Sequence, residues 1–355
     1  MIRDVLKQLW KDKFARVALC VLCLIYLALF FADFLAPYTK DFSDRTMAYV
    51  PPSKVFVIDE NGRLSKPYTY NYRRDFDGEN LRIVYSLDRS QKHYVKFFAQ
   101  GEPYKFLGLI PMKRHLVTTD SNGRLFLLGT DINGRDVFSR LLFGGRISMT
   151  IGFLALFVLF PIGLLYGGIS GYFGGKVDSI MMRFAEAIMS IPSFYLLIIL
   201  ASVLPSGMTS IQRFMLIVVI LALVGWAGFA RVVRGMVLSV KNQEFVQASR
   251  SIGQSRIGII IKHILPQTTS FVIVAMTLSV PSYILSESGL SFLGLGIQQP
   301  DASWGNMLKE AQEFTNIISR PWLLTPGFLI FIAVLAFNLI GDTIRDILDP
   351  KSKVR

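Results

Sequence analysis

The stretch SGYFGGKV, residues 170–177, comes nearest in this chain to a binding loop for nucleotide phosphates. Such a loop needs the pattern GxxxxGK followed by Ser or Thr, because backbone amides and the lysine hold the phosphates while the hydroxyl reaches magnesium. Here Ser170 stands where the first glycine is needed, and Val177 stands where the hydroxyl residue is needed. We therefore predict that the chain binds neither ATP nor magnesium itself.

The other reactive residue types do not form a recognisable set. His93 and His115 have no cysteine or histidine partner at the spacing of metal ligands. Cys20 and Cys23 form a CxxC, but both lie in an apolar stretch without the strand and helix of a redox motif. No Ser-His-Asp set, zinc motif or pair of carboxylates stands in a convincing arrangement. We expect no catalytic residue, no metal site and no cofactor site, so the polypeptide alone is not predicted to be an enzyme.

Six apolar segments carry the architectural signal. The chain has 355 residues, of which 52% are hydrophobic and 18% charged, against about 25% charged in a typical soluble domain. A helix needs about 20 apolar residues to cross a bilayer. The six segments that approach or exceed this length are residues 17–36, 147–169, 187–204, 214–230, 268–285 and 323–341. The predicted fold class is an all-α polytopic membrane protein with six transmembrane helices.

The distribution of basic residues predicts the orientation of these helices. Short cytoplasmic loops of membrane proteins are rich in Lys and Arg. In this chain Lys and Arg are frequent in residues 1–16, 231–267 and 343–355, and sparse in residues 205–213 and 286–322. We therefore place the three basic stretches, and with them both termini, on the cytoplasmic side of the inner membrane. Topology accounts for much of the net charge of +13, and no aromatic-interleaved basic stripe is present, so we expect no nucleic-acid partner.

A long polar insertion, residues 37–146, separates the first two predicted helices. Its Tyr, Phe, Pro and Gly content, with runs such as LRIVYSLD and HYVKFFAQ, favours short strands and turns over disorder. Long insertions translocate regardless of their charge, so we predict a small mixed module on the extracytoplasmic side. The predicted order is a cytoplasmic N-terminal segment (1–16), the first helix (17–36), the insertion (37–146), a five-helix core (147–342) and a cytoplasmic tail (343–355).

The cytoplasmic loop at residues 231–267 contains a polar, helix-forming stretch. Seven apolar residues follow helical spacing on either side of Gly253: Phe245, Ala248, Ile252, Ile257, Ile260, Ile261 and Ile264. Pro266 lacks a backbone donor and restricts Leu265, which favours a turn into the fifth helix. We predict two short helices with a bend, one face packed under the bundle and the other offered to the cytoplasm. Such a loop is either an ordinary surface helix pair or a docking element.

The order of residues in this loop resembles the cytoplasmic signature of ABC importer permeases, written EAA, three residues, G, nine residues, I, x, LP. QASRSIG aligns with the first half and HILP with the second. The matching residues are Gln247, Ala248, Ser249, Gly253, Leu265 and Pro266. Two positions depart from the signature, because Gln247 replaces its acidic residue and His263 stands where Ile is usual.

Four further stretches resemble landmarks of the dipeptide and oligopeptide permease subfamily in the expected order. They are FLLGTDINGRDVFSRLLFGGRISMTIG at residues 126–152, GYFGGKVD, SESGLSFLGLGIQQPDASWGNML and FNLIGDTIRDILDP. The resemblance covers residues 126–350 and reaches the first helix weakly. The insertion between residues 38 and 125 is longer than usual for the subfamily and largely unmatched.

The resemblance implies the type I ABC importer permease fold and a membrane subunit of an ATP-driven importer. Such a subunit pairs with a second homologous permease, two cytoplasmic ABC ATPase subunits and an extracytoplasmic solute-binding protein, within membrane lipid. ATP and magnesium would then sit on the partner ATPases. Residues 241–266 would contain the coupling helix, and its expected contacts with an ATPase are Glu244, Phe245, Gln247, Ala248, Ser249 and Gly253.

Three alternatives stand beside this interpretation. Nickel permeases share many of the same landmarks, so nickel is the alternative to a peptide cargo. A proton- or sodium-driven carrier needs ionisable residues deep in its helices, whereas Glu186, Glu287 and Asp342 are expected at helix ends. A channel needs a selectivity filter or a ring of like charges, and the sequence indicates neither.

Overall fold

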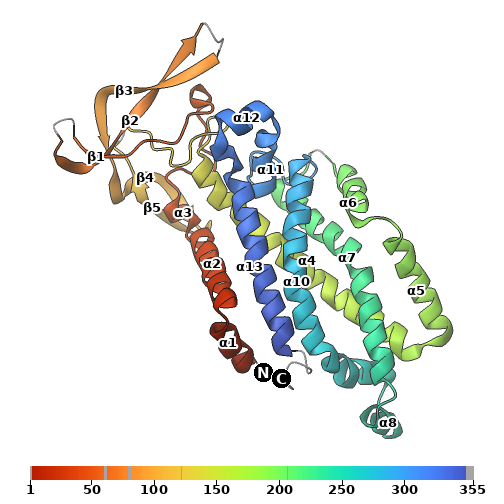
Figure 1. Ribbon diagram of the computed structural model, residues 1–355. Helices are drawn as coiled ribbons and strands as arrows, with labels where there is room; N and C mark the ends of the chain where they lie inside the picture. Colours follow the sequence, from red (N-terminus) through yellow and green to blue (C-terminus); the bar gives the residue numbers. More distant parts are fainter. Residues whose placement is uncertain (1, 60–61, 79–81, 121, 206, 349–355) are drawn as a thin grey trace. The chain divides into compact units, whose positions relative to one another are not determined.

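The computed structural model describes residues 2–59, 62–78, 82–120, 122–205 and 207–348, and these form two compact units. Unit 1 comprises Met1–Leu22, Met149–Gly296 and Ile330–Arg355, and unit 2 comprises Cys23–Ser148 and Ile297–Leu329. Three helices contribute residues to both units (Figure 1): α2 (Lys13–Phe30), α4 (Val137–Phe173) and α13 (Thr325–Leu348). The predicted tail at 343–355 is helical to residue 348, and residues 349–355 lie outside the described part.

Within the described residues, five helical stretches are long and apolar enough to cross a membrane. They are Lys13–Phe30, Val137–Phe173, Ser210–Val240, Arg256–Phe292 and Pro321–Leu348. The number becomes six if α5 (Gly175–Met189) and α6 (Ser193–Ser202) together form one span that is bent by 78°. The prediction of a mostly helical protein with several membrane spans is therefore confirmed.

The third predicted helix differs from the structure. An uninterrupted helix over residues 187–204 is wrong, because α5 ends at Met189 and α6 begins at Ser193. Pro192 has no N–H for the helical hydrogen-bond ladder, and its ring disfavours helical geometry at Ile191. Pro192 itself has φ −55° and ψ 124° and precedes the first residue of α6. The break therefore follows from the local sequence.

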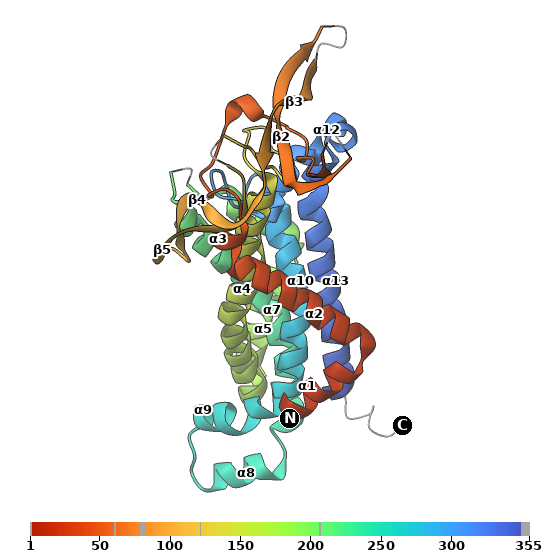
Figure 2. The same ribbon diagram turned by 90° about the vertical axis from the view of Figure 1, so that its left-hand side faces the viewer.

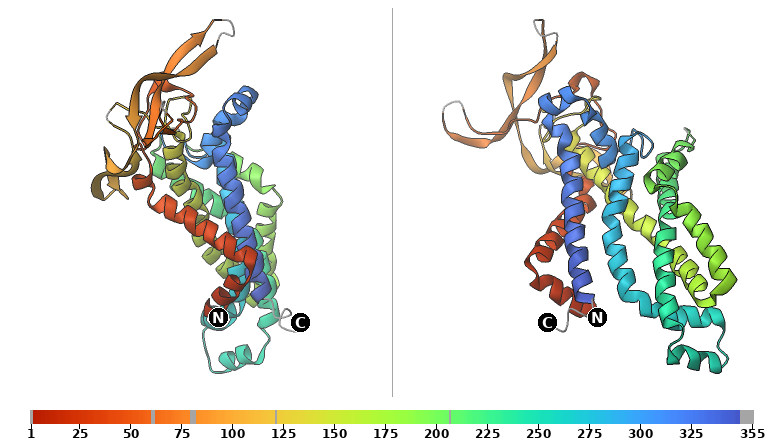
Figure 3. Two further views of the ribbon diagram at one scale, coloured as in Figure 1. Left: turned by 60° about the vertical axis from the view of Figure 1, so that its left-hand side comes forward. Right: turned by 45° about the vertical axis from the view of Figure 1, so that its right-hand side comes forward.

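Unit 1 is helical in its described residues. Besides its shares of α2, α4 and α13 it contains α1 (Ile2–Lys11), α5, α6, α7 (Ser210–Val240), α8 (Glu244–Ser251), α9 (Arg256–Ile259), the π-helical turn η2 (Ile260–Ile264), the 3₁₀ turn η3 (Leu265–Thr268) and α10 (Thr269–Phe292). Helix α5 lies beside α7 (Figure 3). Several predicted boundaries move outward. Helix α4 begins at Val137 instead of residue 147, α7 includes residues 231–240 of the expected loop, and α10 extends beyond residue 285 to include the buried Glu287.

Three glycines on one side of α4 bring its backbone against α7. Gly163, Gly167 and Gly171 recur every four residues and therefore share one helix face. A Cβ atom added at Gly167 would lie 2.3 Å from the carbonyl oxygen of Ala230, and one at Gly171 would lie 2.8 Å from that of Arg234. Small residues at this spacing allow membrane helices to approach closely and gain van der Waals contact. The α4–α7 contact thus depends on the absence of side chains at these positions.

Unit 2 contains strands in the insertion, as predicted, but three of them have 11 to 14 residues and are longer than the short strands expected. Strands β1 (Phe56–Ile58), β2 (Leu64–Asp77) and β3 (Arg82–Tyr94) form an antiparallel sheet in that order, and β4 (Lys96–Phe106) pairs with β5 (Ile110–Thr118) as an antiparallel hairpin. The helical elements of unit 2 are α3 (Ala32–Leu35), η1 (Arg45–Met47), α11 (Trp304–Leu308), η4 (Lys309–Gln312), α12 (Phe314–Ser319) and η5 (Pro321–Leu324). An aromatic core stacks Tyr38 on Phe42 and Phe126.

A buried ionic cluster surrounds the start of α4. The Nε atom of Arg135 donates to Asp131 at 2.6 Å, and Arg140 lies 3.4 Å from the same carboxylate. The backbone N–H of Ile132 donates to Glu310, so the cluster includes η4. Burial raises the pKa of the Glu310 carboxyl to about 7, with the charge of Asp131 acting in the same direction. Such a cluster is stable only when its members are paired and hydrogen-bonded.

Asp136 caps α4 in the same region. Its Oδ2 atom accepts hydrogen bonds from the backbone N–H of Ser139 at 2.7 Å and from the Ser139 hydroxyl at 2.6 Å. Burial nevertheless raises the pKa of the Asp136 carboxyl to about 7. The capping geometry therefore needs an oxygen acceptor at this position, whereas the buried environment disfavours its negative charge.

We predict that Gly167→Ala lowers the stability of the chain while Gly235→Ala does not. The added methyl group at Gly167 meets the backbone of α7, which costs about 1–3 kcal/mol when a packed site is overfilled. A Cβ at Gly235, on α7, meets nothing within 4 Å, so the higher helix propensity of Ala is expected to stabilise by up to about 1 kcal/mol. The measurement is the thermal unfolding midpoint in one detergent at one heating rate. Equal midpoints for both variants contradict the close α4–α7 contact.

Asp136→Asn is expected to weaken the pH dependence of stability. The folded pKa of Asp136, about 7, lies above its ordinary value of 3.8, so the free energy of unfolding falls as pH rises from about 4 to 7 and then levels off. Asn retains a capping oxygen and has no charge to bury. Unfolding midpoints between pH 5 and pH 8 should decline less in Asp136→Asn than in wild type, while the exposed control Asp41→Asn follows wild type. A decline in Asp136→Asn equal to that of wild type contradicts the raised pKa of Asp136 in the folded protein.

Candidate functional site

The predicted bend at Gly253 is present as a helix C-cap. Helix α8 ends when Gly253 adopts φ +79°, a conformation that residues with a side chain rarely adopt. The N–H of Gly253 donates to the carbonyl of Arg250 at 3.1 Å, and the N–H of Gln254 donates to that of Ser249 at 3.3 Å. These are the two bonds of a Schellman motif. Ser255 then caps α9 by accepting from the N–H of Gly258, so a short linker joins two short helices (Figure 2).

The apolar residues of α8 that follow helical spacing do not pack against the bundle. Phe245, Ala248 and Ile252 are all exposed, as the predicted contact of Phe245 and Ala248 with a partner requires. Val246 is buried instead, in a cluster with residues of α7, α9 and η2: Val233, Val237, Ile259 and Ile264. Val246 is thus the one buried apolar residue that holds α8 against the rest of unit 1. The other apolar side chains of α8 remain exposed.

The six residues predicted to contact a partner divide into two groups. Glu244, Phe245, Gln247, Ala248 and Gly253 are exposed. Ser249 is only 8% exposed, and its hydroxyl donates to the carbonyl of Phe245 at 2.9 Å. The structure therefore brings five of the six to the surface on one short segment, while Ser249 serves the internal geometry of α8.

The second half of the loop reaches α10 through a turn at the predicted position, Leu265–Thr268. Of the seven apolar residues expected on one face, Ile260 and Ile264 are buried, whereas Ile257 and Ile261 are half exposed. Pro266 lacks an N–H, so the regular ladder is replaced by the π-helical turn η2 and the 3₁₀ turn η3. His263, which occupies the usual Ile position of the signature, lies with Nε2 2.8 Å from the side-chain oxygen of Gln254. This contact ties the linker to η2.

An ion pair beneath the loop connects α5 to α7. Arg234 donates to both carboxylate oxygens of Asp178, at 2.9 and 2.5 Å, and the hydroxyl of Ser170 donates to the same carboxylate at 2.5 Å. Lys241 donates to the carbonyl of Gly171 at 3.0 Å. This network was not predicted from the sequence, because Arg234 and Lys241 each lie among other basic residues that topology alone accounts for. The sequence feature that could have indicated this network is Asp178, the single acidic residue at the end of GYFGGKVD.

The other residues singled out in the sequence have structural roles in the described chain. Ser170, part of the stretch once compared with a phosphate loop, is buried and hydrogen-bonded to Asp178. His93 lies 2.7 Å from Asp120, and the ring nitrogens of His115 lie 2.6 and 2.8 Å from the carbonyl oxygens of Ala36 and Glu102. Within the described residues no three His, Cys, Asp or Glu side chains form a group able to hold a metal ion.

Comparisons with known proteins agree on one family. The model of the family described as "binding-protein-dependent transport system inner membrane component" matches residues 160–354, and that of the "N-terminal TM domain of oligopeptide transport permease C" matches residues 1–52. The chain is 46% identical over 225 residues to the dipeptide transport system permease protein DppC of Bacillus subtilis, an alignment covering 63% of this chain and 68% of that protein.

Oligopeptide permeases show comparable similarity. The chain is 44% identical over 226 residues to the oligopeptide transport system permease protein OppC of Haemophilus influenzae, covering 63% of this chain and 70% of that protein. It is 45% identical over 227 residues to OppC of Escherichia coli K12, covering 63% and 72%. The similarity therefore extends over more than two thirds of each relative.

We predict that Gly253→Val loosens α8 while Gly253→Asn does not. A Cβ at Gly253 meets nothing within 4 Å, so only the left-handed backbone conformation opposes a substitution. Asn tolerates that conformation, whereas a β-branched residue does not, at a cost of about 1–2 kcal/mol. Hydrogen exchange of the amides of α8 should accelerate roughly tenfold in Gly253→Val and change little in Gly253→Asn. Equal exchange in both variants argues against the Schellman cap.

Proposed function

Because the chain belongs to the family of binding-protein-dependent transport system inner membrane components, we propose that it is one membrane subunit of an ATP-driven peptide importer. The complete importer contains a second homologous permease, two cytoplasmic ATPase subunits and an extracytoplasmic solute-binding protein. ATP and magnesium bind to the ATPase subunits, and this chain contributes part of the translocation pathway and no catalytic group. Both of its termini lie in the cytoplasm, and the insertion at residues 37–146 lies on the other side.

The observation that carries the coupling role is the mode of attachment of α8. Val246 is buried against α7, α9 and η2, while Glu244, Phe245, Gln247 and Ala248 stay exposed on the same helix. An exposed aromatic and a small residue on a short, weakly held helix suit insertion into a groove of another protein. We assign that groove to an ATPase subunit, and α8 to the coupling helix.

A continuous set of contacts leads from α8 into the helices of unit 1. Val246 packs with Val233 and Val237 of α7. Helix α7 is in turn bound to α5 through Arg234 and Asp178, and to the end of α4 through Lys241. When the ATPases close on ATP, the displacement of α8 is transmitted along these contacts, and the bundle rocks between inward and outward openings.

A peptide is the proposed cargo. The relatives are named for dipeptide and oligopeptide transport, which favours peptides over the nickel alternative. Selection among peptides is assigned to the solute-binding protein, because variable side chains require a pathway that touches them weakly.

Ala248→Trp is expected to uncouple ATP hydrolysis from transport. A large side chain on the exposed face of α8 obstructs its seat on the ATPase, whereas folding of unit 1 is spared because Ala248 is exposed. In proteoliposomes holding the whole transporter, peptide uptake per ATP hydrolysed should fall at least about tenfold, which corresponds to about 1.4 kcal/mol of lost coupling.

The matched control is Gln267→Trp. Gln267 is exposed in the same loop but lies outside α8, so uptake per ATP should remain within about twofold of wild type. Wild-type coupling in Ala248→Trp, with correct membrane insertion, contradicts the assignment of α8.

A separate measurement tests the class of transporter. Uptake into vesicles by the complete complex should require ATP and the soluble binding protein, and excess peptide but not nickel should compete. Uptake driven by a proton gradient alone identifies a secondary carrier and refutes the importer.

A further inference from the structure

The turn that ends the β4–β5 hairpin has an unfavourable residue at its tip. The N–H of Leu109 donates to the carbonyl of Phe106 at 3.0 Å, and the two central residues, Leu107 and Gly108, have φ of 49° and 76°. Both values lie in the left-handed region, where Gly, Asn and Asp are preferred. A leucine in the left-handed region costs about 1–2 kcal/mol. Leu107 therefore disfavours the local conformation.

The surroundings do not offset this cost by burying the tip. Leu107 is 44% exposed, Leu109 is 81% exposed and Ile110 is 58% exposed. Met112 continues the same exposed apolar surface. A cluster of large apolar side chains on the outside of a protein marks a surface for another protein or for a membrane. Strain at an exposed turn is likewise a sign of function.

The hairpin points back along the first membrane span. Near the start of β4, the ring centroids of Phe98 and Phe34 are 5.9 Å apart. At the end of β4, the ring centroids of Phe106 and Phe30 are 5.7 Å apart. Because Phe30 precedes Phe34 by one helical turn, the tip is directed toward α2. The N–H of Leu107 donates to the Asp33 carboxylate at 3.1 Å and fixes this position.

The exposed tip is thereby continuous with the surface of α2. Phe30 is the last residue of the apolar span, and it is exposed together with Leu24 and Leu27. The rings of Phe30 and Phe106 bridge this surface to the hairpin. An apolar surface that adjoins a membrane span at its end lies at the height of the lipid interface. This continuity favours lipid over a protein partner.

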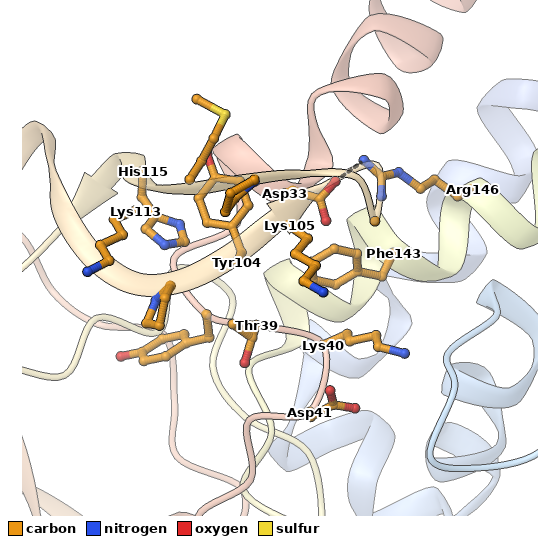
Figure 4. Close-up of a pocket in the computed structure, with 15 residues that line it drawn as sticks. Asp33, Thr39, Lys40, Asp41, Tyr104, Lys105, Lys113, His115, Phe143 and Arg146 are labelled. Carbon is orange, nitrogen blue, oxygen red and sulfur yellow. Dashed lines mark hydrogen bonds and ion pairs between the residues drawn. The ribbon is translucent and has the colours of Figure 1, made fainter.

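A basic cavity adjoins the tip, and its lining includes Gly108 and Met112. It has a volume of about 670 Å³ and is lined by four basic residues, Lys40, Lys105, Lys113 and Arg146, and by two acidic ones, Asp33 and Asp41. Arg146 pairs with Asp33 at 2.8 Å and also donates to the carbonyls of Leu29 and Phe30. Figure 4 shows Lys105 reaching toward Phe143 of α4. With one acid paired, the excess charge of the cavity is positive.

We propose that the tip of the β4–β5 hairpin inserts into the bilayer interface beside α2, and that Lys105 and Lys113 hold the phosphate of an anionic lipid headgroup. Apolar side chains at the tip bury in the acyl region, while lysine stems extend from it and keep their charges among the headgroups. Leucine is then favoured at residue 107 because burial in lipid offsets the conformational cost. The hairpin becomes a second attachment of unit 2 to the membrane, in addition to its helices.

The test determines whether lipid or water surrounds a probe at position 109. The complete transporter carries Cys20→Ala, Cys23→Ala and Leu109→Cys, labelled with the fluorophore NBD, in nanodiscs of phosphatidylethanolamine and phosphatidylglycerol. Lipids bearing a nitroxide at acyl carbon 5 should quench the emission at least about twofold, and aqueous iodide should quench it weakly. The control is Leu64→Cys in β2, which is 89% exposed and should respond to iodide alone.

Two outcomes overturn insertion. If iodide quenches the probe at Leu109 as strongly as the one at Leu64, the tip lies in water. If neither iodide nor the nitroxide reaches it, a protein partner covers the tip instead of lipid. Neither outcome bears on ATP-driven uptake, which the same preparation measures independently.

The headgroup contact is tested with lysine variants. Replacing phosphatidylglycerol by phosphatidylcholine should weaken nitroxide quenching at Leu109 in the otherwise unchanged protein. The double change Lys105→Gln and Lys113→Gln should abolish this lipid dependence, whereas Lys66→Gln, at an exposed lysine of β2, should preserve it. A dependence that persists in the double variant refutes the headgroup contact.

Discussion

The close approach of α4 to α7 is the contact on which the rest of unit 1 depends. A methyl group at Gly167 would overlap the backbone of α7, so the two helices touch through main-chain atoms. In a bilayer no hydrophobic effect drives helices together, and such packing supplies the attraction instead. The same register brings Lys241 to the carbonyl of Gly171. The polar network at the end of α7 is therefore a consequence of glycine spacing in α4.

The loop after α7 combines a firm base with a lightly held helix. Arg234 and Asp178 form a bidentate pair under it, which is the strongest geometry available to two charged side chains. Helix α8 has one buried apolar residue, Val246, and a glycine cap that needs no side-chain contact. This difference in attachment suits an element that a partner must displace without disturbing the helices behind it.

Sequence analysis predicted the features that depend on local composition. The apolar segments indicated a multi-span helical protein, and Gly253 indicated the bend, because glycine readily adopts the left-handed conformation that such a cap needs. The helix break at Pro192 was equally local and was overlooked. The residue that holds α8 could not be predicted, since Phe245 is larger than Val246 and only the position of α7 decides which of them is covered.

Other features required the arrangement of segments distant in sequence. The glycines of α4 have meaning only once α7 is known to be their partner. Asp178 and Arg234 are separated by 56 positions, and neither is unusual in its own segment. From sequence alone the tip of the β4–β5 hairpin is a simple turn. Its position beside α2 follows only from the contact between the rings of Phe30 and Phe106.

The length of α7 has a geometric consequence for the loop that follows it. Its 31 residues extend about 46 Å at 1.5 Å per residue, whereas the hydrocarbon layer is about 30 Å thick. Roughly ten residues at its C-terminal end, including Arg234, thus project past the lipid tails as a stalk. This stand-off holds α8 clear of the headgroups, which suits the proposed docking of a soluble protein without contact with the bilayer.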